Sequence, residues 1–336
     1  METINRYLSD IASRFSDRRL NLFDVKAVHL DANQLVLQGR VLDQDTFQFL
    51  RHSLEERLPG LTIDHSQVRV LRQPVPCLLQ VATNLTSVHA DPSWLAEMLS
   101  QCTFGTSLEL LDEQGRWVFV RQEDGYLGWM YRPYLTDHPT PAPTYIVASP
   151  LVEIHAEPDA TSPLRSRLVG GTLVQVVSTR SAWAEIDANT WGWIPLTDLR
   201  ALDHLPASPD MRRKAIARDS AAMIGVPYLW GGTSVNGIDC SGLAQLLHRW
   251  IGITIPRDAD MQYEAGHKIE PPFQPGDLLF FGETGEKRSI THVGISLGEW
   301  RIIHSSRSRN GVYTDDVQEV EHLRDSFLGA ASYLVS

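Results

Sequence analysis

Cysteine, long apolar runs and an excess of positive charge are all scarce in this 336-residue sequence. Its three cysteines are an odd number without the dense spacing of a disulfide-stapled secreted domain, so we expect at least one free thiol in a monomer. A formal net charge of -11 argues against nucleic-acid binding, which draws most of its affinity from clustered Lys and Arg. No polybasic patch points to a membrane surface either.

The first twenty residues place Glu, Asn, Arg and Asp where a signal peptide needs an unbroken apolar core. No later stretch approaches the length of a transmembrane helix. A cytoplasmic location without a membrane partner is therefore expected. With 43% hydrophobic and 21% charged residues, the chain has an ordinary globular composition, and its length predicts two or more domains.

The first segment, residues 1–72, is predicted to be a small α/β unit. Its pattern alternates helical and strand periodicity: a helix, a strand over 35–41, a helix through residues 47–54 and a strand over 68–70. No reactive constellation occurs there, so a packing or spacer role is the simplest interpretation.

Between residues 77 and 200 the sequence repeats itself, which indicates duplicated structural units. Three features recur 66 residues apart (155 − 89), and a Gly-Trp pair recurs 64 apart (192 − 128). The repeated pairs are His89 and His155, Gly105 and Gly171, Trp117 and Trp183, Gly128 and Gly192.

Each copy consists of short β-rich runs broken by Gly, Asp and Pro, which predicts two small antiparallel barrels at 77–136 and 144–200. Pro-rich residues 137–143 form a stiff linker between them. Both copies resemble bacterial SH3-like domains. Trp129 and Trp193 are expected to be core aromatics, with ligand platforms as the alternative.

The sequence pattern changes at residue 210. An Arg- and Ala-rich helix is predicted to begin there and to end at Gly225. After a Gly-rich stretch, apolar residues from Leu243 to Ile251 fall at helical spacing. Asp239 is a plausible N-cap, which places Cys240 in the first turn. A helix start favours thiolate and supplies N–H groups for an oxyanion, although a lone Cys is more often a small buried hydrophobe.

Three predicted strands follow, over 278–281, 291–297 and 300–304, the last two joined by a tight turn at Gly298-Glu299. Counting across this hairpin brings His292 and His304 onto one face of neighbouring strands. His292 could then act as base towards Cys240 while His304 orients its ring, which is the logic of a catalytic triad.

The segments GVPYLWGGTSVNGIDCSGL, FQPGDLLFF, ITHVGISL and IIHSS together resemble the NlpC-type family of papain-like cell-wall peptidases. The resemblance covers residues 210–336 and implies that Cys240, His292 and His304 are catalytic, with Tyr228 assisting the oxyanion. It also implies that Asp239 and Ser241 hold substrate, although Asp239 could equally be only a helix cap.

Two barrels ahead of such a domain resemble recycling peptidases that cleave L-Ala-γ-D-Glu-diaminopimelate, a small murein peptide. The resemblance implies that Asp258 pairs with the free amine of the substrate. Ala259 stands at a neighbouring substrate contact where some relatives have Ser. In those relatives the first barrel closes one end of the cleft, and Tyr126 and Glu97 are the counterparts of its amine-recognising residues, Glu97 having an ordinary solvated charge as its alternative.

The sequence therefore predicts an α+β multidomain cysteine peptidase that needs no metal or cofactor, because no His, Cys and carboxylate cluster has ligand spacing. Two alternatives stay open: a peptidoglycan-binding scaffold without activity, and an amidase or acyl transferase on the same fold. The oligomeric state, the role of residues 1–72 and the preferred diamino acid are not predicted.

Overall fold

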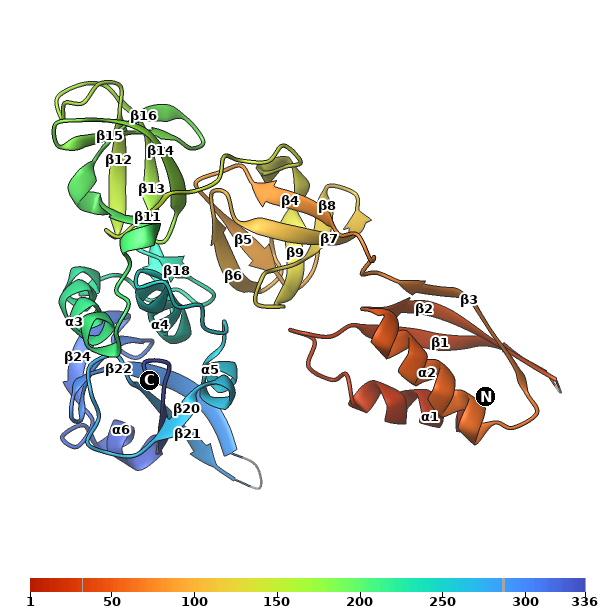
Figure 1. Ribbon diagram of the computed structural model, residues 1–336. Helices are drawn as coiled ribbons and strands as arrows, with labels where there is room; N and C mark the ends of the chain where they lie inside the picture. Colours follow the sequence, from red (N-terminus) through yellow and green to blue (C-terminus); the bar gives the residue numbers. More distant parts are fainter. Residues whose placement is uncertain (32, 286–287, 336) are drawn as a thin grey trace. The chain divides into compact units, whose positions relative to one another are not determined.

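The computed structural model describes residues 1–31, 33–285 and 288–335, shown as a ribbon in Figure 1. It contains two compact units. The first consists of Met1–Leu79 and Leu108–Arg132, and the second of Gln80–Ser107 and Pro133–Ser336. All predicted site residues except Tyr126 belong to the second unit.

The first unit begins with two helices and a three-stranded sheet of order β1-β2-β3. Strands β1 and β2 are antiparallel whereas β2 and β3 are parallel, so α2 is the crossover helix that a parallel pair requires. Asp43 caps α2 by accepting a hydrogen bond from the Thr46 N–H. Strand β1 is missing from the sequence prediction, although alternate residues along it are partly buried. The elements are α1 (Glu2–Ser13), β1 (Phe23–Leu30), β2 (Gln34–Val41), α2 (Gln44–Arg57) and β3 (Thr62–Val70).

The same unit contains the antiparallel strands β7 (Ser107–Gln114), β8 (Trp117–Arg121) and β9 (Leu127–Tyr131). Trp129 on β9 is only 8% exposed and packs on Phe119, with 5.2 Å between ring centroids. Trp129 is therefore a core aromatic, as the sequence predicts.

The second unit contains a seven-stranded antiparallel sheet of order β13-β12-β16-β15-β14-β11-β17. Its inward-facing aliphatic side chains, among them Val152, Ile154 and Ile194, form one buried cluster. Trp193 is only partly buried and lies outside the buried members of that cluster. The strands are β11 (Tyr145–Val147), β12 (Leu151–His155), β13 (Leu164–Val169), β14 (Leu173–Arg180), β15 (Trp183–Asp187), β16 (Trp191–Pro195) and β17 (Leu199–Ala201).

The repeat in the sequence is also a repeat of elements. Strand β5 (Leu85–His89) begins 66 residues before β12 (151 − 85), β6 (Met98–Thr103) begins 66 before β13 (164 − 98), and β9 begins 64 before β16 (191 − 127). The Nδ1–H of His89 donates to Ala96 O at 3.2 Å, and that of His155 to Ser162 O at 3.2 Å. Both copies therefore share this side-chain contact as well as the spacing of these strands.

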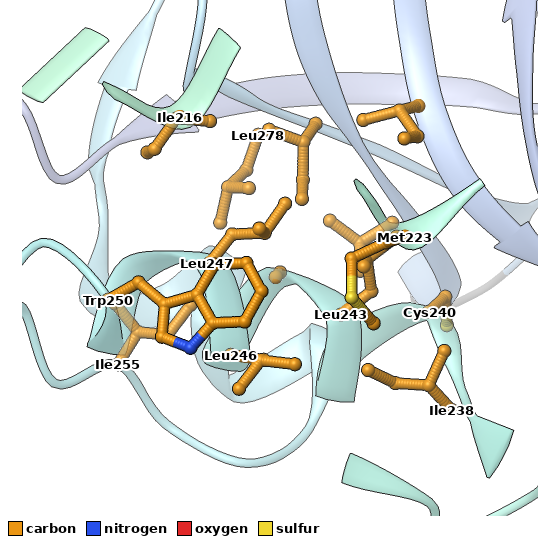
Figure 2. Packing of buried hydrophobic residues seen from close by; sticks show 14 of the residues in the cluster. Ile216, Met223, Ile238, Cys240, Leu243, Leu246, Leu247, Trp250, Ile255 and Leu278 are labelled. Carbon is orange, nitrogen blue, oxygen red and sulfur yellow. The ribbon is translucent and has the colours of Figure 1, made fainter. Parts of the chain in front are cut away.

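The C-terminal part of the second unit packs helices against a six-stranded antiparallel sheet of order β20-β25-β21-β22-β23-β24. Helix α4 lies against β22 and β23, and its residues Leu243 and Leu247 belong to the buried cluster between them. Figure 2 shows Cys240 at one end of α4, beside Met223 and Ile238, with Trp250 at the other end. The elements are α3 (Pro209–Asp219), η4 (Ser220–Met223), β18 (Thr233–Ser234), β19 (Gly237–Ile238), α4 (Cys240–Arg249), α5 (Ala259–Ala265), β20 (His267–Ile269), β21 (Leu278–Thr284), β22 (Arg288–Gly298), β23 (Arg301–Ser306), β24 (Gly311–Asp316), α6 (Glu321–Ser326) and β25 (Phe327–Ser332).

Two local predictions need correction. The helix expected to run to Gly225 ends at Asp219 and continues as the 3-10 turn η4 to Met223. The turn between β22 and β23 is Glu299-Trp300, because Gly298 still pairs with Arg301. Within the described residues, no helix is both long and apolar enough to cross a membrane.

Candidate active site

Cys240 is the first residue of α4, and the residue before it fixes that start. Asp239 has extended backbone dihedrals (φ -92°, ψ 179°), and its Oδ1 accepts the Gly242 N–H at 2.7 Å. The predicted N-cap is therefore confirmed. Gly242 is required because a Cβ there would lie 2.2 Å from Gly232 O. The Asp-Cys-Ser-Gly run thus packs the helix start tightly against the preceding loop.

The carboxylate of Asp239 also forms a buried ion pair that the sequence interpretation missed. Arg257 is 1% exposed, and its Nη2 and Nη1 donate to Asp239 Oδ2 at 2.6 Å and Oδ1 at 3.1 Å. Nη1 also donates to Ser241 Oγ at 2.8 Å. The Gly231 N–H donates to the same carboxylate at 2.9 Å. The side chains of Asp239 and Ser241 therefore serve the helix start, and their predicted contacts with substrate stay predictions.

Strand β6 of the first repeat supports this start from the other side. The Nε of Arg257 donates to Ser100 Oγ at 3.1 Å, and the Thr233 N–H donates to Gln101 Oε1 at 3.0 Å. Gly231 lies so close to this strand that a Cβ would meet Met98 O at 2.4 Å. The loop that precedes Cys240 is thus held between β6 and α4.

The predicted histidine pair is present on neighbouring strands. His292 lies on β22 and His304 on β23, and His292 Nε2 and His304 Nδ1 are 2.7 Å apart. The rings meet at 65° with centroids 5.0 Å apart. His304 is 2% exposed, so its ring is held by packing as well as by this hydrogen bond. The backbone N–H of Val293, the residue after His292, hydrogen-bonds the Cys240 sulfur, which ties the strand to the helix start.

The second histidine of the pair is hydrogen-bonded to an acidic residue that the sequence analysis did not identify. His304 Nε2 lies 2.9 Å from Asp315 Oδ2 on β24, and Arg309 Nη1 donates to Asp315 Oδ1 at 2.7 Å. Burial raises the pKa of Asp315, but the hydrogen bonds from His304 and Arg309 outweigh it and hold this pKa below its ordinary value. Asp315 is therefore an ionised acceptor at the end of a His-His-Asp chain.

Burial sets the resting charges of the reacting pair. Desolvation, and next the negative charge of Asp239, raise the pKa of the Cys240 thiol to about 12, against smaller opposing effects of the Val293 and Ser241 N–H groups. Desolvation, and next His304, lower the pKa of His292 to about 3. The expected preference of the helix start for the thiolate is thus outweighed in the unliganded protein, and both partners rest neutral.

A bridge between the backbones of Tyr228 and Ile238 places Tyr228 next to the segment that leads into Cys240. Desolvation, and next the charges of Cys240 and Asp239, raise the pKa of Tyr228 to about 12. Its phenol therefore stays protonated at neutral pH and can donate a hydrogen bond.

The remaining predicted residues occupy separate positions. Asp258 is the residue before α5 and makes no side-chain cap there, and Ala259 begins the helix. Glu97 is exposed, and its Oε1 accepts a hydrogen bond from Trp230 Nε1 at 2.8 Å. Tyr126, in the first unit, is buried, and its N–H donates to Asp124 Oδ1 at 3.1 Å. In the described part of the chain, no three His, Cys, Asp or Glu side chains are grouped as metal ligands would be.

Comparison with known proteins assigns this geometry to a class. Residues 225–330 match the NlpC/P60 family, and residues 88–132 match the bacterial dipeptidyl-peptidase Sh3 domain. The chain thus carries a cysteine peptidase domain of the NlpC/P60 family together with an SH3 domain.

Its relatives include proteins that align with most of the chain. A protein named gamma-D-glutamyl-L-lysine dipeptidyl-peptidase from Bacillus cereus is 28% identical, over 72% of this chain and 78% of its own. Dipeptidyl-peptidase 6 of Lysinibacillus sphaericus is 25% identical, over 71% and 91%. A crystal structure of an NlpC/P60 family protein from Bacillus cereus has a TM-score of 0.67 at 22% identity, covering 77% of this chain and all (100%) of its own, which shows a shared fold.

Proposed function

We propose that this protein hydrolyses the γ-D-glutamyl to diamino acid bond of murein peptides with a free N-terminal L-Ala, such as L-Ala-γ-D-Glu-diaminopimelate, in murein recycling in the cytoplasm. The observation that carries the proposal is a helix-start thiol, Cys240, next to a strand whose His292 is hydrogen-bonded to a second histidine. The names of relatives that align over most of the chain support the choice of bond.

In this proposal His292 takes the thiol proton as Cys240 attacks the γ-D-glutamyl carbonyl. Because both groups rest neutral, the proton moves during the attack rather than before it. N–H groups at the start of α4 and the Tyr228 hydroxyl stabilise the oxyanion, a contribution of about 3 to 4 kcal/mol per donor. His292 then protonates the departing amine, and water hydrolyses the thioester.

The amine end of the substrate is assigned to Asp258 and Glu97, and the role of Tyr126, which belongs to the first unit, stays a prediction from the sequence. A buried ammonium needs an acceptor, since leaving it unpaired is costly. We also assign residues 144–200 to a second SH3-like domain, supported by the recurrence of its strands at the spacing of the first copy. The amine-binding residues Asp258 and Glu97 would restrict the enzyme to short peptides with an unblocked N-terminus.

The test is incubation with L-Ala-γ-D-Glu-diaminopimelate and mass analysis of the products. Release of free diaminopimelate by the native protein, and none by Cys240→Ala, is expected. The matched substrate carries an N-acetylated L-Ala; it should be turned over far more slowly if the free amine is recognised. Intact peptide after incubation, or transfer of the dipeptide to an added amine without hydrolysis, would contradict the proposed reaction.

A further inference from the structure

The hydrogen-bonded chain behind His292 is longer than the reaction itself requires. Tyr313 on β24 pairs with His304 on β23, so Asp315, two residues further along, lies on the same face. Its carboxylate is 15% exposed and uses one oxygen for His304 and the other for Arg309. The guanidinium of Arg309 also stacks 4.2 Å over the ring of Tyr313. Asp315 is thus held from both sides.

This arrangement determines which nitrogen of each ring carries a proton. An ionised carboxylate can only accept, so His304 Nε2 must be the donor to Asp315. In neutral His304 the other nitrogen, Nδ1, is then an acceptor, and His292 Nε2 must donate to it. Neutral His292 consequently keeps its lone pair on Nδ1. That nitrogen is the one not engaged with His304.

We propose that Asp315 is a positioning residue that fixes the tautomers of both histidines and so leaves His292 Nδ1 as the basic nitrogen towards Cys240. The inference rests on the proposed role of Cys240 and His292 as nucleophile and base. Asp315 acts on the reacting pair through two imidazole rings.

Asp315→Asn is the most direct test of the tautomers, because Arg309 determines the orientation of the new side-chain amide. Arg309 donates to the Oδ1 position, so the asparagine must keep its oxygen there and turn its NH₂ towards His304. His304 Nε2 then has to accept, its Nδ1–H donates to His292 Nε2, and His292 Nδ1 carries the proton. Every hydrogen bond is kept, but the proton of His292 now sits on Nδ1. This nitrogen can therefore no longer accept the proton of Cys240.

The expected result is a fall in kcat of about 100-fold or more with little change in KM, the lower range of what a general base contributes. Arg309→Met alone should change kcat by no more than about threefold, because both oxygens of the Asp315 carboxylate accept and His304 keeps its acceptor without Arg309. In the double variant the amide is free to rotate and present oxygen to His304. Adding Arg309→Met to Asp315→Asn should therefore restore kcat by about tenfold.

A readout without substrate separates this inference from the proposed function. The alkylation rate of Cys240 by iodoacetamide at neutral pH should rank the variants in the same order as kcat, even if the murein peptide is not the substrate. Circular dichroism and denaturant midpoints show that each variant is folded. The inference is overturned if Asp315→Asn alkylates at the native rate, or if Arg309→Met fails to restore any of the loss.

Discussion

Removing the charge of Arg257 tests whether the buried ion pair holds the start of α4. In Arg257→Met the carboxylate of Asp239, which is 6% exposed, loses its cation. Breaking a buried pair from one side costs about 3 to 5 kcal/mol, and we expect the lower end because the Gly231 and Gly242 N–H groups still donate to this carboxylate.

The assay is hydrogen exchange of the α4 amides, since a chain with two compact units need not unfold in one transition. Arg257→Met should lower the opening free energy of α4 by about 3 kcal/mol. Asp239→Asn combined with Arg257→Met should be more stable than Arg257→Met alone, because no uncompensated charge remains. Arg257→Lys, which keeps the charge but loses the planar fork, should lie between native and Arg257→Met.

Two results would refute this reasoning. Exchange in α4 of Arg257→Met within about 1 kcal/mol of native would mean that the remaining donors to Asp239 suffice. A double variant as unstable as the sum of its single substitutions would mean that the two side chains do not interact.

The remaining predictions concern the same domain. Burial lowers the pKa of His248, which is 0% exposed, to about 4; between pH 6.5 and 4 the unfolded chain binds a proton that the folded chain does not. The free energy of unfolding should fall by up to about 3 kcal/mol as pH drops through this window, and His248→Leu should flatten the dependence in denaturant titrations. Gly242→Ala would push a methyl group against Gly232 O; a loss of about 1 to 3 kcal/mol in thermal unfolding is expected, with slower alkylation of Cys240. Unchanged alkylation would show that the helix start tolerates the displacement.

Most of the site could be predicted from patterns among residues that are neighbours in the sequence. Asp239 before an apolar helical pattern marked the helix start, and a strand-turn-strand pattern was enough to pair His292 with His304. These predictions succeeded because cap, turn and period are properties of neighbouring residues. The exact turn residues were misplaced by one position, which did not alter the face on which the histidines lie.

The residues that escaped prediction act across long separations. Arg257 reaches Ser100 over 157 positions, and no spacing rule relates the two. The strand-turn-strand counting that paired the histidines could also have reached Asp315, because its strand β24 follows directly after a turn over residues 307–310. Two adjacent carboxylates, Asp315 and Asp316, ended that strand, and only the register with β23 decides which one faces His304.

The charge state of the thiol depends on a competition that sequence position cannot decide. A helix start stabilises a nearby anion by at most about 2 kcal/mol even in favourable geometry, whereas full burial shifts a pKa by up to several units, each worth about 1.4 kcal/mol. Around Cys240 desolvation and the Asp239 charge win, and the thiol rests neutral. The same burial keeps His292 neutral and therefore able to accept a proton. Ionisation is thus coupled to attack on the electrophile and does not precede it.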